Sequence, residues 1–272
     1  MTSGWPEPLQ FGPWLLERRL AVSAMSEVWL GQRLGDTQTC AVKRVLPIHR
    51  GDATILALFR HEADVMRMLD DIRVPRLLDE GEVRGVPWLS MPYYPGASLQ
   101  ALSAEVQEAG NAARWLAGEV ALALAAVHAA GQVHADVAPD NVLICTDGRV
   151  LLLDLGIAVP RGCRAPVRRG KAQYASPEQI GGEPLTEQTD LYALGKILLA
   201  LGLDDAPTAY DAAALAQWLH AEVPDPVAAK AQLARLVSAV KTTVTPSPWE
   251  AAELRGEVVT DPVADEGATQ TR

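Results

Sequence analysis

The chain has 272 residues, of which 49% are hydrophobic, so it can form one domain of two lobes or two small domains with a large core. Its formal net charge of −10 argues against nucleic acid and anionic membrane surfaces as partners, because both are negatively charged. Three widely spaced cysteines without a C-x-x-C pair argue against a disulfide framework or a zinc site and indicate a reducing compartment. With no signal-peptide pattern and no apolar run of roughly 18–20 residues, we expect a soluble, cytoplasmic protein without a membrane partner.

Residues 1–10 are interpreted as a loose leader. Between residues 11 and 45, apolar and polar positions alternate and turn residues separate the runs, which predicts a small antiparallel meander. Apolar residues at helical spacing then predict a helix over residues 55–69. Two short strands are expected near residues 77–82 and 87–91. The proline- and glycine-rich break at residues 92–96 marks a boundary between two lobes.

Beyond this break the pattern becomes mainly helical, apart from apolar strands near residues 142–144 and 151–153. Helices are predicted over residues 99–108, 112–130, 188–201, 212–223 and 226–240. The polar segment 255–272 is predicted to be disordered. We therefore expect an α+β protein with a β-rich N-lobe (11–91), a hinge (92–96) and a helical C-lobe (97–254).

The most informative stretch is His134 to Asn141, which reads H-A-D-V-A-P-D-N. Thirteen residues after Asn141, Asp154 follows an apolar strand. The carboxylate of Asp136 can accept a hydroxyl proton, while an amide oxygen and a second carboxylate are the hard oxygen ligands that Mg²⁺ prefers. These are the groups that phosphoryl transfer requires.

This arrangement resembles the catalytic loop and metal-binding triplet of protein kinases, and the resemblance covers about residues 10–254. It implies a two-lobed kinase fold with ATP and Mg²⁺ as cofactors. Asp136 is then the catalytic base, and Asn141 and Asp154 are the Mg²⁺ ligands. Lys43, in A-V-K, matches the strand lysine that pairs with the α- and β-phosphates, and Glu62 matches the helix glutamate that pairs with that lysine.

The loop that covers the phosphates departs from the family pattern. Kinases have G-x-G-x-x-G there, whereas this chain has A-V-S-A-M-S from Ala21 to Ser26. Without glycine the backbone loses its access to positive φ, and side-chain atoms stand over the phosphates. We expect the hydroxyl groups of Ser23 and Ser26 to supply donors instead.

The resemblance also assigns an adenine site. It implies that Val28, Ala41 and Leu143 enclose the base and that Met91 closes the back of the pocket. Pro92 and Tyr94 match the hinge positions whose backbone contacts adenine. Proline is acceptable at residue 92, because a carbonyl rather than an N–H is expected to bind there.

Two cationic side chains of the family's catalytic loop are missing. Ala135 replaces an arginine that grips a phosphorylated activation-loop residue in kinases, and residues 155–175 contain no serine or threonine. We therefore expect no regulation by activation-loop Ser/Thr phosphorylation. Ala138 replaces a lysine that touches the γ-phosphate. We expect Lys171 to compensate by reaching Asp136 and the γ-phosphate, the alternative being an exposed lysine without a role.

Five positive charges and no acidic residue lie between Asp154 and Glu178, namely Arg161, Arg164, Arg168, Arg169 and Lys171. They form either a solvated basic loop or a docking strip for an acidic or phosphorylated protein substrate. Two further positions imply structural roles. Asp190 matches the buried aspartate that anchors the catalytic loop in kinases, and Glu178 requires a basic partner, for which Lys241 and Arg255 are candidates.

The combined pattern indicates an ATP- and Mg²⁺-dependent protein kinase of the bacterial Ser/Thr type. The segment Y-A-S-P-E before residue 179 favours protein substrates, since small-molecule kinases of related fold usually lack it. The main alternative is a pseudokinase that binds nucleotide or acts as a scaffold, as the glycine-free loop and Ala138 would allow. A small-molecule phosphotransferase is the third possibility.

Overall fold

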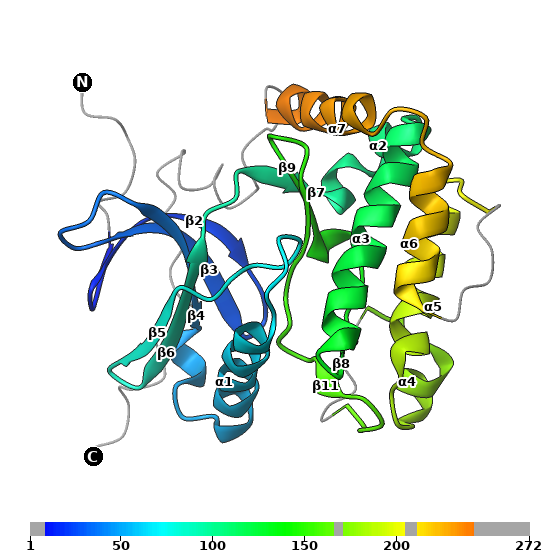
Figure 1. The fold of residues 1–272 in the computed structure, drawn as a ribbon. Coiled ribbons are helices and arrows are strands. Elements are labelled where there is room, and N and C mark those ends of the chain that lie inside the picture. The colour runs from blue at the N-terminus through cyan, green and yellow to red at the C-terminus, as the bar shows by residue number, and fades with distance from the viewer. Residues whose placement is uncertain (1–8, 166–170, 205–210, 242–272) are drawn as a thin grey trace, which may run out of the picture.

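The computed structural model describes residues 9–165, 171–204 and 211–241. The chain forms two lobes, a curled antiparallel sheet flanked by one helix and a larger, mainly helical lobe (Figure 1). The sheet and its flanking helix come from the first third of the sequence, and the other helices come from the remainder. This arrangement confirms the predicted α+β class.

The N-lobe sheet has six strands in the order β1-β2-β3-β4-β6-β5, and every neighbouring pair is antiparallel. The strands are β1 Leu9–Phe11, β2 Trp14–Val22, β3 Ser26–Arg33, β4 Thr39–Val45, β5 Asp79–Val83 and β6 Val86–Pro92. Within the predicted leader, Leu9 and Gln10 already belong to β1 and pair with Leu16 and Leu15. The ordered part of the lobe therefore begins earlier than the sequence pattern predicted.

Alternate residues of β4 face opposite sides of the sheet. Ala41 and Lys43 share one face, while Arg44 lies on the other beside the aromatic core. There the Arg44 guanidinium bonds to buried Glu27 at 2.8 Å and lies 4.6 Å from the centre of the Phe11 ring. Lys43 therefore projects from the face opposite to the one on which Arg44 and Glu27 are buried.

Helix α1 (Ala53–Met68) follows a short 3₁₀ helix η1 (Pro47–His49). The Asp52 side chain caps α1 by accepting hydrogen bonds from the N–H groups of Thr54 and Ile55 at 2.9 and 3.1 Å. Its buried face contacts β4 and β6. That face also carries Glu62, which is 4% exposed, so packing of the helix brings a carboxylate into the interior.

The C-lobe is arranged around the buried helix α3, which contacts α5, α6 and α7 (Figure 1). The helical elements are η2 Leu99–Leu102, α2 Ser103–Gln107, α3 Asn111–Ala129, η3 Pro139–Asn141, α4 Pro177–Gly181, α5 Glu187–Ala200, α6 Ala212–Ala221 and α7 Pro226–Lys241. The single helix predicted over 99–108 is divided into η2 and α2. By length and composition α3 is apolar enough to span a membrane, but 67% of its most apolar window is buried within this fold.

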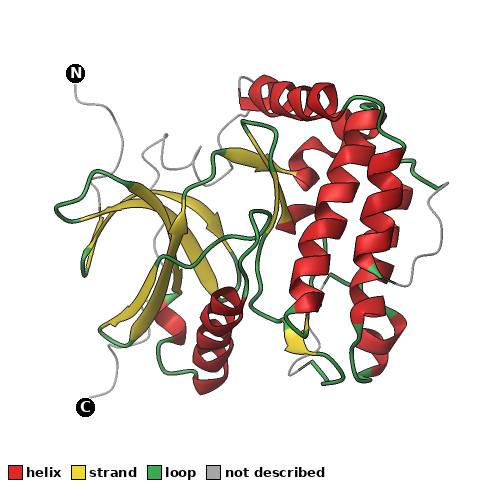
Figure 2. Ribbon diagram, in the orientation of Figure 1, coloured by secondary structure: helices red, strands yellow, loops and turns green. Residues whose placement is uncertain are grey.

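Two small sheets complete the C-lobe (Figure 2). One contains β10, β9 and β7 (Val150–Leu152, Val142–Cys145 and Gly96–Ser98), and the other contains β11 and β8 (Val159–Pro160 and Gln132–Val133). Strands of two or three residues are too short to show alternation, which explains why β7, β8 and β11 were not predicted. The β9–β10 hairpin is the part of these sheets that bears on the candidate metal ligands, because Asn141 precedes it and Asp154 follows it.

Two of the three cysteines are buried in the fold as small hydrophobic residues. Cys40 and Cys145 are buried, whereas Cys163 is exposed, and all three are free thiols. Burial raises the pKa of the Cys145 thiol to about 11, so it remains protonated and unreactive at neutral pH.

We predict that Gly96→Ala lowers the free energy of unfolding by about 1–3 kcal/mol, because a Cβ at Gly96 would lie 2.4 Å from the backbone oxygen of Ile144. Gly195→Ala is the matched control. It lies inside α5 with no atom within 4 Å of an added Cβ, so it should stabilise the fold by about 0.5–1 kcal/mol. Urea denaturation of both variants measures the two effects, and equal effects would contradict the prediction.

Candidate active site

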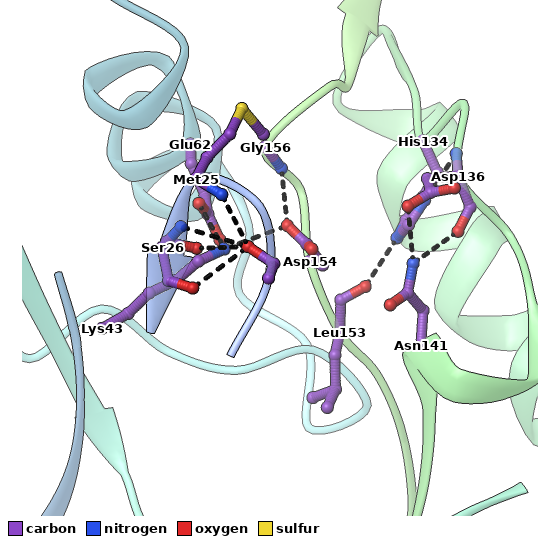
Figure 3. A network of polar contacts seen from close by, with 11 residues as sticks. Met25, Ser26, Lys43, Glu62, His134, Asp136, Asn141, Leu153, Asp154 and Gly156 are labelled. Carbon is purple, nitrogen blue, oxygen red and sulfur yellow. Dashed lines mark hydrogen bonds and ion pairs between the residues drawn. The ribbon is translucent and has the colours of Figure 1, made fainter. Parts of the chain in front are cut away.

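An ammonium group from the N-lobe sheet joins carboxylates from both lobes (Figure 3). The Lys43 Nζ atom lies 2.7 Å from each carboxylate oxygen of Glu62 and 3.0 Å from Asp154 Oδ1. Lys43 comes from β4 and Glu62 from α1, while Asp154 follows β10 in the C-lobe. The sequence-predicted lysine, glutamate and metal-binding aspartate therefore meet in one cluster.

Lys43 and each of the two carboxylates attract one another, whereas burial, together with the Asp154 charge, raises the pKa of Glu62. Burial alone would lower the pKa of Lys43, but the carboxylates of Asp154 and Glu62 outweigh it and raise the pKa, so the ammonium stays protonated. The Lys43 charge is also the main cause of the lowered pKa of Asp154, with a smaller contribution from the Gly156 N–H. Asp154 is therefore an anion at neutral pH, and its side chain remains 45% exposed for a ligand.

Asp136 and Asn141 form the second half of the site (Figure 3). The Asn141 amide nitrogen donates to the backbone oxygen of Asp136 at 2.8 Å and to its Oδ2 atom at 2.9 Å. Because both amide hydrogens are used in this way, the Asn141 side-chain oxygen is left to accept or to coordinate. The two bonds also fix the direction of the Asp136 carboxylate.

His134 connects the catalytic loop to the strand before Asp154. Its Nδ1 atom accepts from the Asp136 N–H at 3.2 Å, so Nε2 carries the proton and donates to the Leu153 carbonyl at 3.1 Å. The Leu153 N–H in turn donates to the Asn141 backbone oxygen at 2.7 Å. Leu153 thus links the two halves of the site, and fully buried His134 acts as a structural spacer.

Buried Asp190 on α5 anchors the catalytic loop, as the resemblance implied. Its two oxygens accept from the N–H groups of His134 and Ala135, both at 2.8 Å. His128 of α3 adds a third contact at 2.8 Å. The carboxylate is therefore fully compensated, and a buried charge in this state can be retained at little net cost.

Gln179 on α4 provides an anchor that sequence reasoning missed. Its side-chain N–H donates to the Ala135 carbonyl at 2.7 Å, and its side-chain oxygen accepts from the Ser176 N–H at 3.0 Å. Ala135 has a φ of +64°, a left-handed conformation that costs an alanine energy. The bonds from Asp190 and Gln179 hold this residue in place on both of its peptide groups.

The glycine-free loop between β2 and β3 is closed by its own serines. The Ser23 hydroxyl accepts from the N–H groups of Met25 and Ser26 at 3.3 and 3.1 Å, and it lies 3.1 Å from the Ser26 carbonyl. Ser26 is buried, and its hydroxyl lies 3.2 Å from that of Ser23. No residue of this loop has positive φ, so the turn forms without glycine. The two hydroxyls act within the loop, and their predicted contact with phosphate remains a prediction.

Three of the six predicted adenine-site residues, Val28, Ala41 and Met91, lie on the Lys43 face of the sheet. Val28 is opposite Lys43 in the β3–β4 pairing, and Ala41 is opposite Met91 in the β4–β6 pairing. Residues opposite one another project from the same face. Half-buried Leu143 lies on β9, Pro92 ends β6, and Tyr94 follows in the hinge, where Arg149 stacks on its ring at 5.5 Å.

Two cavities of the N-lobe lie apart from these residues. One, of about 640 Å³, is lined by Phe11, Arg44 and Arg84 among others, and the other, of about 250 Å³, lies between α1 and β5. Neither contains Lys43 or Asp154. They are therefore separate from the predicted nucleotide site.

The described cations of the basic segment are paired within the chain. Lys171 pairs with Asp140 in η3, and its predicted approach to Asp136 and a γ-phosphate stays a prediction. Arg161 pairs with Glu187 and also donates to the His128 carbonyl at 3.3 Å, and Arg164 donates to the Gly182 carbonyl at 2.8 Å. Arg168 and Arg169 lie outside the described residues.

Glu178 has a local hydrogen-bond partner. Its Oε1 atom accepts from the Thr189 hydroxyl of α5 at 2.8 Å. The two predicted candidates, the Lys241 side chain and Arg255, lie outside the described part of the chain.

The donor set suits a divalent cation that is shared with a nucleotide. Asn141 and Asp154 offer an amide oxygen and a carboxylate, and Mg²⁺ in phosphate-transfer sites is bound by one or two such ligands together with phosphate oxygens. No group of three or more His, Cys, Asp or Glu side chains able to hold a metal occurs in the described ranges. The residues thus fit Mg²⁺ that arrives with ATP better than a metal bound by protein alone.

Comparison with known proteins agrees with this geometry. The family described as "Protein kinase domain" matches residues 17–234, a range that includes Lys43, Glu62, Asp136, Asn141 and Asp154. The chain belongs to the protein kinase family. Similar bacterial proteins are the serine/threonine-protein kinases PknD of Mycobacterium tuberculosis, 31% identical over 229 residues, and AfsK of Streptomyces coelicolor, 33% identical over 202 residues.

These alignments cover most of this chain but only part of the relatives. The match to PknD covers 82% of this chain and 34% of that protein, and the match to AfsK covers 71% and 25%. The crystal structure of the Mycobacterium tuberculosis PknI kinase domain is similar over 93% of this chain and 98% of that one, with 25% identity and a TM-score of 0.55. The kinase therefore spans about a quarter to a third of the length of these curated relatives and nearly the whole of the solved domain.

We predict that Lys43→Met in this kinase raises the pKa of Asp154, because the Lys43 charge is the main cause of its lowering and without it burial is opposed only weakly, by the Gly156 N–H and His134. Since the folded-state pKa of Asp154 lies below its ordinary value, its contribution to stability is present above that value and declines as pH falls through the folded-state pKa. A carboxyl ¹³C NMR titration of both proteins measures the change. An unchanged Asp154 titration would contradict the assignment of Lys43 as its partner.

Proposed function

We propose that this chain is an ATP- and Mg²⁺-dependent protein kinase that transfers the γ-phosphate to serine or threonine hydroxyls. The observation that carries the proposal is the joining of Lys43, Glu62 and Asp154 across the two lobes, next to a fixed Asp136–Asn141 pair. Each group has a chemical role in phosphoryl transfer, and a scaffold would need none of them.

Different residues serve to bind the nucleotide phosphates with Mg²⁺ and to accept the proton of the substrate hydroxyl. Lys43 neutralises phosphate oxygens, and Asn141 and Asp154 supply oxygen ligands. When bound, Mg²⁺ would withdraw charge from the phosphates and orient them. Asp136, held by Asn141, positions the substrate hydroxyl and accepts its proton late, so orientation provides most of its effect.

We further propose that activity does not depend on activation-loop Ser/Thr phosphorylation. Ala135 offers no guanidinium for a phosphate, and the segment 155–175 has no serine or threonine. Asp190 and Gln179 instead bind the peptide groups of Ala135 directly. These contacts need no covalent modification to form.

A protein substrate agrees with the Ser/Thr kinase relatives and with the Y-A-S-P-E segment. We also propose that this substrate is acidic or phosphorylated and binds at the basic segment between Asp154 and Glu178. Not all of the cations of this segment are available to attract it. Arg161 and Arg164 are engaged with Glu187 and Glu183, which reduces their attraction for a partner. Comparing transfer to matched acidic and basic peptides tests this preference.

A pseudokinase is the second candidate, and two observations favour it. The loop from Ser23 to Ser26 is closed on itself without glycine, and buried Ala138 gives the transferred phosphoryl group no cation. Both features reduce stabilisation of the phosphates. Nucleotide binding without transfer would identify this alternative.

The deciding experiment is incubation with γ-labelled ATP, Mg²⁺ and a protein substrate. We expect transfer by the wild type and a decrease of about 10²- to 10⁴-fold in Asp136→Asn, which removes the proton acceptor. Glu105→Gln, an exposed change on α2, serves as the control and should retain the wild-type rate. Equal rates in wild type and Asp136→Asn would reject Asp136 as the base.

We predict that Lys171→Ala lowers kcat by about 10²-fold if its ammonium leaves Asp140 to contact the γ-phosphate during transfer. Loss of its exposed ion pair with Asp140 should change stability by at most about 1 kcal/mol. Lys196→Ala, which removes an ammonium near the Tyr192 ring on α5, is the control. An unchanged kcat in Lys171→Ala would show that Lys171 does not replace the missing lysine.

A further inference from the structure

One side-chain hydrogen bond connects the middle of α1 to the segment that follows Asp154. The His61 Nε2 atom lies 2.8 Å from the backbone oxygen of Ala158. His61 precedes Glu62 on α1, and Ala158 is the fourth residue after Asp154. The bond therefore runs from the N-lobe to the C-lobe, beside the Lys43 cluster.

The chemistry of this contact is fixed by its acceptor. A backbone carbonyl can only accept, so the His61 ring must carry a hydrogen on Nε2 and donate it. Ala158 is 1% exposed, and its own N–H donates to the Leu155 carbonyl at 3.1 Å. The Ala158 carbonyl thus belongs to a closed turn, which gives His61 a well-placed acceptor.

The position of the contact determines its consequence. Glu62 reaches Lys43 only while α1 remains against the C-lobe, and α1 also contacts that lobe near its C-terminal end, where the Gln132 side chain approaches the Met68 sulfur at 3.9 Å. His61 lies two turns earlier, at the level of the cluster. We propose that His61 is a positioning residue that holds α1 in place, so that Glu62 and Asp154 meet Lys43.

This proposal rests on the proposed kinase function and extends it to the position of the helix. Ala135 cannot bind a phosphorylated residue, and no serine or threonine precedes Ala175 in the segment after Asp154. The helix therefore needs a contact that is present without phosphorylation. The His61–Ala158 bond meets this requirement, since both groups are part of the unmodified chain.

Three variants test the role of His61. His61→Phe keeps a ring but removes the donor, whereas His61→Gln places an N–H near the former Nε2 position. Arg60→Gln is the matched control, because Arg60 is the neighbour of His61 on α1. This change breaks the exposed ion pair between Arg60 and Glu82 of β5. We expect His61→Phe to reduce kcat by about two- to tenfold, as the loss of one net hydrogen bond implies, with rescue in His61→Gln and no change in Arg60→Gln.

Hydrogen exchange gives a readout that does not depend on activity. His61→Phe should exchange faster than the wild type at residues 59–66 and 155–159, and His61→Gln should not. Equal exchange and equal kcat in His61→Phe and the wild type would overturn the proposal. A His61→Gln variant that restored neither the slow exchange nor the kcat of the wild type would also overturn it. If the wild type transfers no phosphate, the proposed function fails, while the exchange data still decide whether His61 holds the helix.

Discussion

The active arrangement depends on one ammonium group that holds carboxylates from two lobes. Lys43 bonds to Glu62 of α1 and to Asp154 of the C-lobe at 2.7 and 3.0 Å, so helix, sheet and hairpin must be placed together for any of the three to be satisfied. One positive and two negative charges leave a net negative site. A divalent cation with nucleotide phosphates complements this balance, which is why the cluster both stabilises the fold and prepares it for a ligand.

Around this cluster, side chains bind the backbone of the catalytic loop more than they bind one another. Asp190 accepts from two N–H groups, Gln179 donates to the Ala135 carbonyl, and His134 donates to the Leu153 carbonyl. Backbone partners cannot change rotamer or charge state, so a loop held in this way has one low-energy geometry. The loss of the family's arginine at Ala135 is compatible with an ordered loop for this reason.

Sequence reasoning predicted the elements with strong periodicity and the residues with a distinctive spacing. It identified α1, α3, α5, α6 and α7 to within a few residues, and it named Lys43, Glu62, Asp136, Asn141 and Asp154. It missed β7, β8, β11 and the Gln179 and His61 contacts, because very short strands and side chain-to-backbone bonds leave no periodic pattern. For Glu178 it considered only distant cations, since a hydroxyl eleven residues away carries no charge signal.

The contact between Glu178 and Thr189 has a consequence for synthesis of the chain on the ribosome. Its two partners are eleven residues apart, and both are synthesised before α6 and α7. A pairing that closes over so short a distance costs little chain entropy. The α4–α5 corner can therefore reach its final geometry early, and α6 and α7 can assemble on a surface that is already formed.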